Sequence, residues 1–158
     1  MERVAIDEVP PTSFETVLDR RGLSDPLGTT DVALNRYRLA PTQRLSTGLH
    51  AHADQEEVFV VVEGELAFET EAGEVVVHEG EAVRFAPGEF QSGKNDSDDD
   101  VVLFAVGAPR ETTDIRVPKE CPECGHGEMR VVAGEDGDSL ECPNCDCLLE
   151  SPPPREEW

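Results

Sequence analysis

The chain has 158 residues, of which 35 are Asp or Glu and 13 are Lys or Arg, so its formal net charge is -22. This length fits one domain of usual size with a small appended module. The charge disfavours a nucleic-acid partner, because the phosphates would be repelled, and no apolar run reaches the about 18 residues of a membrane-spanning helix.

The acidic excess should destabilise the folded chain in dilute buffer through self-repulsion. At molar salt the Debye length falls to roughly 3 Å, which screens this repulsion. We therefore expect a protein adapted to high cytoplasmic salt. An acidic disordered chain is the alternative, and frequent apolar runs such as VFVVV and VVLFAV disfavour it. The start, MERVAIDEVPP, lacks the basic and apolar regions of a secretory signal, so we expect a cytoplasmic protein.

Residues 1–30 contain many proline, glycine and aspartate residues, and we expect a weakly structured N-terminal arm with one short helix around SFETVLDRRG. Residues 31–117 have the pattern of short β-strands separated by turns. The expected strands are DVALNRYRLA, STGLHAH, EVFVVVE, ELAFET, EVVVHE, AVRFAP, VVLFAVGAP and TDIRVP. Turns are marked at Glu63-Gly64-Glu65 and at EAGE, residues 71–74. This regular spacing predicts an all-β, antiparallel barrel or sandwich.

The run VFVVV has apolar residues on both faces of its strand. With a period of two, Phe59 and Val61 point to the same side as Glu57, and the remaining valines point to the other side. One face can line a barrel interior. The other face needs the arm, another sheet or a second subunit as cover, and we expect a homodimer.

The stretch GLHAHADQEEVFVVVEGE, residues 48–65, places two histidines and a glutamate where they can bind a metal. His50 and His52 are two residues apart, so both side chains leave the same face of a strand. ADQE can form a turn, after which Glu57 begins the returning strand and faces the same interior. Two imidazoles and a carboxylate suit Fe, Mn, Ni or Zn with open coordination positions. The alternative is that both histidines are partly exposed polar residues at a sheet edge.

These residues resemble the first motif of the cupins, His50-x-His52-x4-Glu57-x6-Gly64. In the second motif, GEAVRFAPGEFQSGKN, Gly80, Gly88 and Asn95 stand at the cupin spacing, and Gln91 stands where the fourth ligand, a histidine, is expected. The resemblance covers about residues 32–108 and is to single-barrel cupins of halophilic archaea. It implies a cupin-type β-barrel, also called a double-stranded β-helix or jelly roll, with a metal held inside.

Gln91 leaves three possibilities open. Its carbonyl oxygen can complete a four-ligand site with His50, His52 and Glu57, although an amide oxygen is a weaker donor than imidazole. It can instead stand beside a three-ligand site and orient a substrate or a water. In the third case the barrel holds no metal and binds an anion or a small molecule.

Residues 118–150 form a cysteine module, and the Pro-rich residues 151–158 form a tail that we expect to be disordered. Cys121-x2-Cys124 and Cys142-x2-Cys145, seventeen residues apart, have the spacing of a four-thiolate structural zinc site, and the module looks like a zinc ribbon. MRVVAG and a Gly/Asp turn can form a hairpin between the two pairs. Rubredoxin-like iron is the alternative metal. So short a module needs metal to fold.

Cys147 and His126 are additional candidates in this module. We expect a free thiol at Cys147 and a surface or supporting role for His126, although either can replace a neighbouring ligand. Acidic residues dominate the module, so a protein partner or simple stabilisation is expected, rather than nucleic-acid binding.

Two functions remain open. One is a non-enzymatic module that binds a divalent metal and a small molecule, with the ribbon contacting a partner. The other is a metal-dependent cupin enzyme, a dioxygenase or an isomerase acting on a small polar substrate. The sequence assigns no general base, and a fold resemblance does not determine a reaction.

Overall fold

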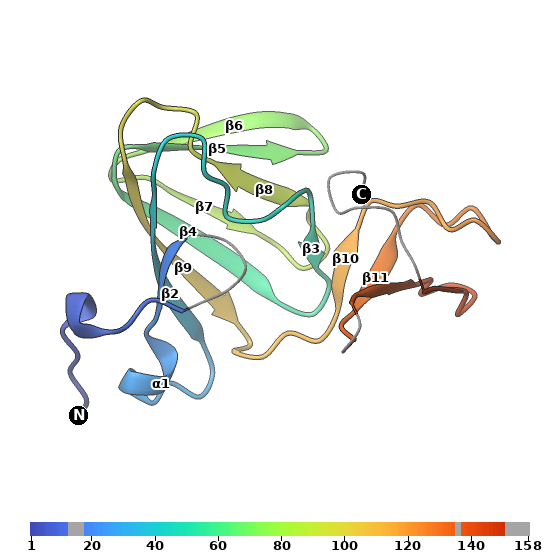
Figure 1. The fold of residues 1–158 in the computed structure, drawn as a ribbon, viewed down its shortest axis with the longest axis horizontal. Helices are drawn as coiled ribbons and strands as arrows, with labels where there is room; N and C mark the ends of the chain where they lie inside the picture. The colour runs from blue at the N-terminus through green and yellow to red at the C-terminus, as the bar shows by residue number, and fades with distance from the viewer. Residues whose placement is uncertain (13–17, 135–136, 151–158) are drawn as a thin grey trace.

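The protein is nearly all β, and every strand pair is antiparallel (Figure 1). The structure is a computed structural model that describes residues 1–12, 18–134 and 137–150. Two short helical turns, η1 (Ile6–Glu8) and α1 (Ser24–Leu27), lie near the N-terminus. The strands form three sheets, two of which face each other and enclose the main core.

The first sheet has the order β1-β2-β9-β4-β7. Its strands are β1 (Asp19–Gly22), β2 (Ala33–Leu39), β9 (Val101–Ala108), β4 (Glu56–Glu63) and β7 (Ala82–Phe85). The second sheet has the order β6-β5-β8. It contains β6 (Gly73–His78), β5 (Glu65–Thr70) and β8 (Gln91–Lys94). Both turns expected from the sequence are present, since β4, β5 and β6 follow one another through Gly64 and through residues 71–72.

The core lies between these two sheets because alternate residues of each strand point inward. Phe59 and Val61 are 3% and 0% exposed, whereas Val62, on the other face of β4, is 42% exposed, as the period-two pattern predicts. The rings of Phe59, Phe68 and Phe85 pack together at the centre, with centroids 4.9 to 6.1 Å apart. The observed architecture is therefore the antiparallel barrel of the jelly-roll type predicted from the sequence.

The third sheet joins the barrel to the cysteine module. Its order is β13-β12-β11-β10-β3. The strands are β3 (Ala51–His52), β10 (Ile115–Val117), β11 (Met129–Val132), β12 (Ser139–Glu141) and β13 (Leu148–Leu149). The β11–β12 pair is the expected hairpin of the module. A small second core contains Val117, Met129 and Leu140 together with Cys121 and Cys142.

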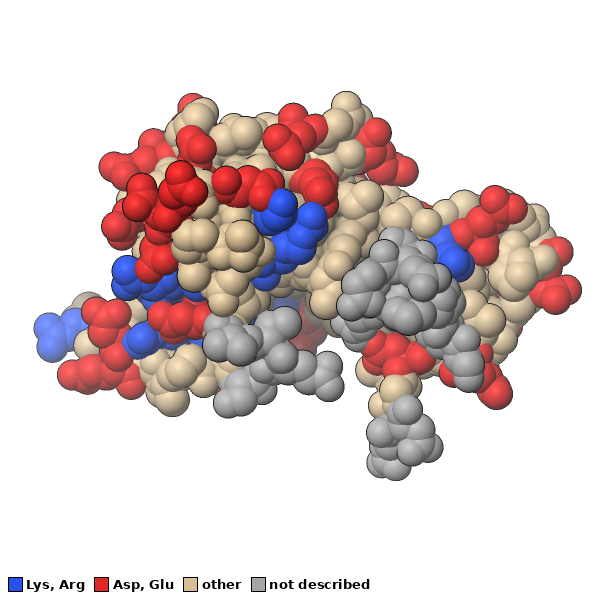
Figure 2. Space-filling model, turned by 45° about the horizontal axis from the view of Figure 1, so that its top comes forward, with Lys and Arg blue, Asp and Glu red and all other residues tan. Residues whose placement is uncertain are grey.

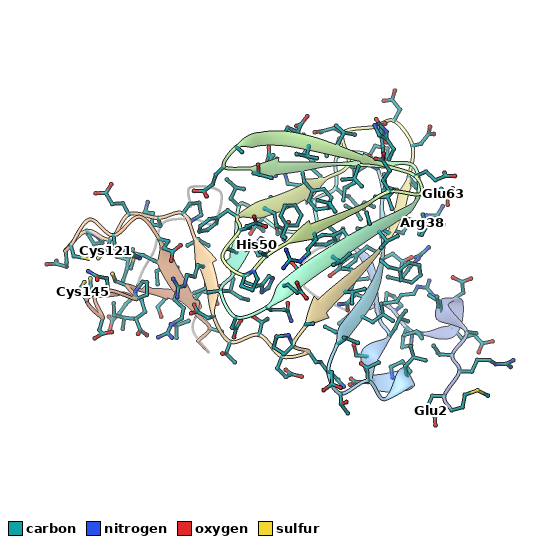
Figure 3. All side chains as sticks on the ribbon, turned by 180° about the vertical axis from the view of Figure 1, so that it is seen from behind. Glu2, Arg38, His50, Glu63, Cys121 and Cys145 are labelled. Carbon is teal, nitrogen blue, oxygen red and sulfur yellow. The ribbon has the colours of Figure 1, made fainter. Side chains whose placement is uncertain are left out.

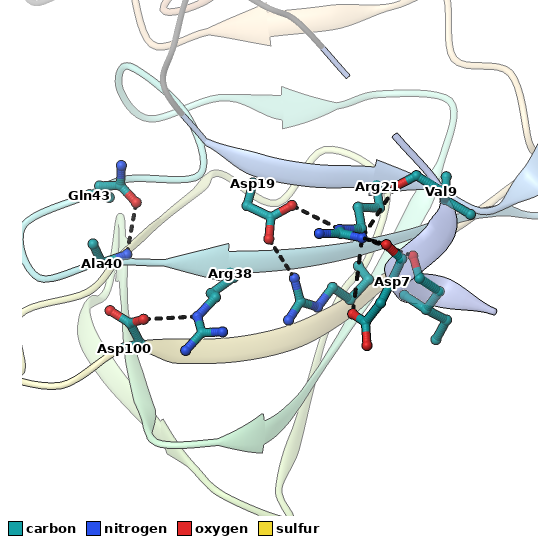
Figure 4. A network of polar contacts seen from close by, with 10 residues as sticks. Asp7, Val9, Asp19, Arg21, Arg38, Ala40, Gln43 and Asp100 are labelled. Atoms are coloured by element: carbon teal, nitrogen blue, oxygen red, sulfur yellow. Dashed lines mark hydrogen bonds and ion pairs between the residues drawn. The ribbon is translucent and has the colours of Figure 1, made fainter. Parts of the chain in front are cut away.

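The predicted helix around SFETVLDRRG is wrong at its end, because residues 19–22 form strand β1 on the edge of β2. Residues 13–17 lie outside the described residues. Hydrogen bonding to the main chain of β2 outweighs the helical preference that the sequence indicates for these residues. Arg21 also stabilises the strand, because its guanidinium donates hydrogen bonds to the carbonyl oxygens of Ile6 and Asp7 and its Nε pairs with Asp19 (Figure 4). Asp19 also pairs with Arg36 at 2.8 Å, so the arm is anchored to the outside of the barrel.

Acidic side chains are spread over both the barrel and the cysteine module on the face shown in Figure 2, and basic side chains occur in a few smaller groups. Many basic residues pair with acidic neighbours, as Arg38 does with Asp100. In the described part of the chain, no helix combines the length and hydropathy required to cross a bilayer.

Candidate metal centres

Three strands bring the predicted barrel ligands together. His50 forms a backbone bridge with Gln91, the first residue of β8, and His52 lies on β3, while Glu57 lies near the start of β4. One donor atom each of His50, His52 and Glu57 lies within 4.8 Å of the others. The loop of residues 53–55 provides the turn that the sequence predicts, so Glu57 faces the histidines. Figure 3 shows His50 among the barrel strands, far from the labelled cysteines.

The hydrogen bonds at Nδ1 of the two imidazoles leave both Nε2 atoms without a proton. His50 Nδ1 lies 3.4 Å from the carbonyl oxygen of Gly48, which can only accept, so this nitrogen carries the proton. His52 Nδ1 lies 3.2 Å from Thr112 Oγ1, whose own hydrogen is donated to Asp54 Oδ1 at 2.6 Å. His52 Nδ1 is therefore also the donor. Both Nε2 atoms therefore carry a lone pair, the state that a metal requires, and the lone pair of His50 Nε2 faces the Gln91 amide at 3.4 Å.

Burial determines the charge of these groups. It lowers the pKa of His50, and together with the charge of His50 it lowers the pKa of His52 to about 4. Both imidazoles are thus neutral near pH 7. Burial also raises the pKa of Glu57 to about 7, against the opposing effects of a hydrogen bond from Gln91 and the charge of Arg20. Since His52 Nε2 and Glu57 Oε2 are 3.5 Å apart, a proton or a cation between the facing lone pairs would relieve their repulsion.

Gln91 is buried beside this cluster with one of its amide atoms unpartnered. It is 3% exposed, and its Nε2 donates to Glu57 Oε2 at 3.1 Å and lies 3.4 Å from His50 Nε2. Its Oε1 is buried and makes no hydrogen bond with any of the described residues. A half-turn of the amide would exchange the two atoms and direct the oxygen at the cluster. That orientation would be repulsive beside a carboxylate alone and favourable beside a cation, so the residue fits a weak fourth ligand.

Asp54, Thr112 and Thr113 support the cluster through hydrogen bonds, and sequence reasoning did not identify them. Asp54 accepts hydrogen bonds from Thr112 Oγ1, from Thr113 N at 2.8 Å and from Thr113 Oγ1 at 3.0 Å. Burial would raise the pKa of Asp54, but these bonds outweigh it and lower the pKa to about 2. A permanent anion thus orients Thr112 toward His52. The only signal in the sequence is that Asp54 follows His52 by two positions.

Two other residues of the barrel, Glu56 and His78, lie outside the cluster. Glu56 points away from the cluster and pairs with Arg84 at 2.7 Å on the outside of the barrel. His78 is a surface residue, with a side chain that is 60% exposed and lies 3.1 Å from Glu65.

The four predicted cysteines form the second centre. Sulfur atoms at about 2.3 Å around one zinc ion would stand about 3.8 Å apart. Sγ of Cys121 is 3.8 Å from Sγ of Cys145, and Sγ of Cys124 is 3.6 Å from Sγ of Cys142, so the donor set fits a tetrahedral four-thiolate site. A hydrogen bond from the Asn144 side chain lowers the pKa of Cys124 to about 6, which favours the thiolate.

The two cysteine turns have the same backbone pattern. The amide of Gly125 donates to the carbonyl of Cys121, and the amide of Asp146 donates to the carbonyl of Cys142; both donor residues have positive φ, 70° and 56°. The amides of Cys121 and Cys142 in turn bond the carbonyls of His126 and Cys147. Cys147 thus takes the position of His126 in the second turn. Neither belongs to the group of four converging donors.

The third sheet contains residues of both candidate centres, His52 on β3 and the strands of the cysteine module. On β10, Ile115 pairs with His52 of β3, and Val117 pairs with Met129 of β11. The amide of Ala53 also donates to the carbonyl of Asp114 at 2.8 Å. The strand β3, which carries the candidate ligand His52, is therefore two strands away from β11 of the cysteine module.

Comparison with known proteins agrees with this fold. Residues 35–107 match the family described as cupin domain, a segment that includes all four barrel candidates and ends before the cysteines. No curated protein matches the sequence.

Three solved structures with similar folds are enzymes by their names. A sugar phosphate isomerase of a cupin superfamily from Silicibacter pomeroyi is 20% identical, covering 94% of this chain and 97% of that one, with a TM-score of 0.66. A polyketide cyclase from Streptomyces resistomycificus is 22% identical, covering 73% and 83%, with a TM-score of 0.62. A predicted oxalate decarboxylase from Thermotoga maritima is 21% identical, covering 68% and 98%, with a TM-score of 0.60. Sequence identities of 20–22% establish a similarity of fold and do not determine a shared activity.

Proposed function

We propose that this protein is a cupin-type module that binds a divalent transition metal and a small molecule in its barrel, without a reaction at the metal. His50, His52 and Glu57 would hold the ion, and Gln91 would add its carbonyl oxygen as a weak fourth ligand. The observation that carries the proposal is the convergence of one imidazole nitrogen from each of His50 and His52 and one carboxylate oxygen of Glu57, all within 4.8 Å of one another. Fe, Mn, Ni and Zn all suit this donor set.

The cysteine module would hold a structural zinc ion. Four sulfur donors close such a site, so the zinc would stabilise the module and would leave no position for a substrate. The second core is small, and binding free energy would supply much of the stability of the module.

Metal analysis of the full chain tests both assignments. The protein is purified in molar salt without chelators, and its metal content is measured for the wild type, His50→Ala/His52→Ala and Cys121→Ser/Cys142→Ser. We expect two ions per wild-type chain, with one lost in each double variant. His78→Ala is the matched control, since His78 is an exposed histidine outside the cluster, and it should retain both ions. Unchanged metal content in the histidine double variant would contradict the barrel assignment.

A metal-dependent enzyme, a dioxygenase or an isomerase, is the second candidate. It is favoured by the donor set, in which three strong protein ligands leave other positions open. A divalent ion bound there would act as a Lewis acid toward a ligand oxygen. The isomerase, decarboxylase and cyclase names of the structural neighbours point the same way.

Azide binding to the Co²⁺-loaded protein distinguishes the two candidates. An enzyme needs an exchangeable coordination position, so azide should change the visible spectrum of the wild type. If azide changes the spectrum of Gln91→Ala but not that of the wild type, Gln91 occupies the remaining coordination position. That result would favour the binding module.

We also infer a homodimer. Val58 and Val60, on the outward face of β4, are only half-buried, and Val62 is 42% exposed. A second copy would cover this face, and light scattering in molar salt should give twice the mass of the chain. A partner protein at the cysteine module remains part of the proposal for a regulatory role.

A further inference from the structure

The amide of Gln91 stands at ligand spacing from the candidate metal cluster. Its Nε2 lies 3.1 Å from Glu57 Oε2 and 3.4 Å from His50 Nε2, and Glu57 Oε2 lies 3.5 Å from His52 Nε2. Two donors at about 2.1 Å from one ion are about 3.0 Å apart at a right angle and about 3.4 Å apart at a tetrahedral angle. The three observed distances therefore match those between neighbouring ligands of a single ion.

The main chain holds Gln91 in this position. Its amide donates to the carbonyl oxygen of His50 at 2.9 Å, and the amide of His50 donates to the carbonyl oxygen of Gln91 at 3.1 Å. The side chain is buried, so it does not extend into solvent. Rotation of the terminal amide remains possible, and it exchanges a hydrogen-bond donor for an oxygen acceptor at the cluster.

The amide oxygen of Gln91 lacks a partner that a cation would supply. Within the described part of the chain, Oε1 is buried and accepts no hydrogen bond, whereas Nε2 faces the acceptor atoms of Glu57 and His50. A buried acceptor without a partner is costly. An ion among the cluster atoms would give this oxygen a partner once the amide has turned.

The oxygen of Gln91 changes the composition of the donor set. A histidine at this position would give three imidazole nitrogens and one carboxylate oxygen, whereas Gln91 gives two nitrogens and two oxygens. Imidazole suits Ni²⁺ and Zn²⁺, and carbonyl and carboxylate oxygens suit Mn²⁺. Exchanging a nitrogen for an oxygen therefore reduces the advantage that Ni²⁺ normally has over Mn²⁺ in a nitrogen-rich site.

We propose that Gln91 sets the metal preference of the barrel, shifting it from Ni²⁺ toward Mn²⁺ by supplying a second oxygen donor. The inference rests on the proposed function and specifies which metals the site distinguishes. Gln91 acts on the ratio of two affinities, so Ni²⁺ can still bind more tightly than Mn²⁺ in absolute terms. The ratio is the quantity to measure.

The test is isothermal titration of the full chain with Mn²⁺ and with Ni²⁺ in molar KCl. One equivalent of Zn²⁺ is added first to occupy the cysteines, and only binding that is lost in His50→Ala/His52→Ala is assigned to the barrel. We expect Gln91→His to raise the ratio of the Ni²⁺ affinity to the Mn²⁺ affinity by about tenfold. Gln91→Leu removes the oxygen without adding a nitrogen, and it should also raise the ratio, because Mn²⁺ loses the donor that suits it best.

Pulsed EPR of the Mn²⁺-loaded protein counts the imidazole nitrogens bound to the ion, a number that a side chain outside the coordination sphere would not change. We expect two in the wild type and three in Gln91→His. Glu56→His is the matched control, since Glu56 points to the outside of the barrel and pairs with Arg84. This variant should keep two nitrogens and the wild-type ratio.

The outcomes separate this inference from the proposed function. Mn²⁺ and Ni²⁺ that bind through His50 and His52 with the same ratio in the wild type, Gln91→His and Gln91→Leu would overturn the role of Gln91 alone. Two bound nitrogens in a folded Gln91→His protein would do the same. Binding of both ions that is indifferent to His50 and His52 would contradict the barrel metal site, and the inference would fail with it.

A ratio that rises equally in Glu56→His would also count against Gln91, because any added histidine would then have the effect.

Discussion

His52 is fixed at both ring nitrogens, one toward the candidate metal position and the other toward Thr112. The Thr112 hydroxyl accepts from His52 Nδ1 and donates to Asp54, so a single side chain selects the tautomer in which Nε2 is free. Such supporting groups typically change metal affinity by about 10–100-fold when removed. The position of Thr112, sixty residues after His52, explains why no local motif reveals it.

Thr112→Val should lower barrel metal affinity by about tenfold, because His52 loses the acceptor that holds its proton on Nδ1. Competitive Co²⁺ titration of the full chain measures the change. Thr113→Val is the matched control, since Thr113 also bonds Asp54 but does not contact His52. Equal losses in the two variants would mean that the loop as a whole, rather than the bond to His52, controls affinity.

Barrel metal affinity should rise with pH up to about 7 and then level off. A proton and a metal ion compete for Glu57, whose pKa burial raises to about 7, whereas the pKa of His52 is about 4, so this imidazole does not compete in that range. Below pH 7 we expect about a tenfold loss of affinity per pH unit, the slope for one displaced proton. In Glu57→Gln the affinity should be lower and nearly independent of pH between 6.5 and 8, because burial lowers the pKa of both imidazoles. A wild-type profile that bends near pH 4.5 would contradict the raised pKa.

Strand β8 is buried although its sequence, QSGK, contains no apolar residue. Gln91, Ser92 and Gly93 are all buried, and each has a specific neighbour. A Cβ on Gly93 would lie 2.7 Å from Leu45 Cδ1 and 3.1 Å from both Leu66 Cδ2 and Phe68 Cε1. Because Gly93 has no side chain, these core side chains pack directly against β8. This packing positions the strand on which Gln91 faces the cluster.

Gly93→Val should destabilise the protein by about 1–3 kcal/mol, because the added atoms overpack a closed core. Chemical denaturation in molar salt measures this loss. Gly127→Val is the control, since a Cβ there meets no atom within 4 Å and its φ is not positive. If the two variants were equally stable, the close contacts at Gly93 would not be the constraint.

Strands β1 and β8 show how far the sequence determines the fold. Alternating or apolar runs predict β2, β4, β5, β7 and β9, because those strands bury one face or both. The valine run also predicts β6, although Val77 is its one buried residue. Strands β1 and β8 escape prediction because polar residues, Arg20 and Gln91, occupy their inward positions. For the candidate site, spacing identifies His50, His52, Glu57 and the four cysteines. It does not identify Asp54 or Thr112, because the bond between them joins segments 58 residues apart.

At the scale of the whole molecule, the net charge of -22 predicts a stability that depends on salt. The thermal midpoint should rise as KCl increases from 0.1 to 3 M, because the Debye length falls from about 10 Å to a few Å and screens surface repulsion. Asp98→Asn/Asp99→Asn removes two exposed charges beside Glu63 and should raise the midpoint most at low salt. A midpoint that is flat or falls with KCl would contradict adaptation to high salt.

The continuous sheet from β3 to β13 should couple the two candidate centres. Val117 packs with Cys121 and Cys142 in the second core, while Ile115, two residues earlier on the same short strand, pairs with His52. Loss of metal from the cysteines would unfold the module, since its small core offers little other stability. Strand β10 would then lose its partner β11, and the backbone that holds His52 and Thr112 would loosen.

Cys142→Ser should therefore lower barrel metal affinity by about tenfold, although Cys142 contacts none of the barrel ligands. Competitive Co²⁺ titration of the full chain measures the affinity, and hydrogen exchange of the β3 and β10 amides reports the loosening directly. Cys147→Ser is the matched control, because Cys147 lies in the same module but outside the group of four donors. Unchanged barrel affinity in a Cys142→Ser protein whose module has lost its exchange protection would show that the barrel holds His52 without help. Lower barrel metal affinity in Cys142→Ser would mean that oxidation or chelation of the cysteines also weakens the barrel site, through strands β11, β10 and β3.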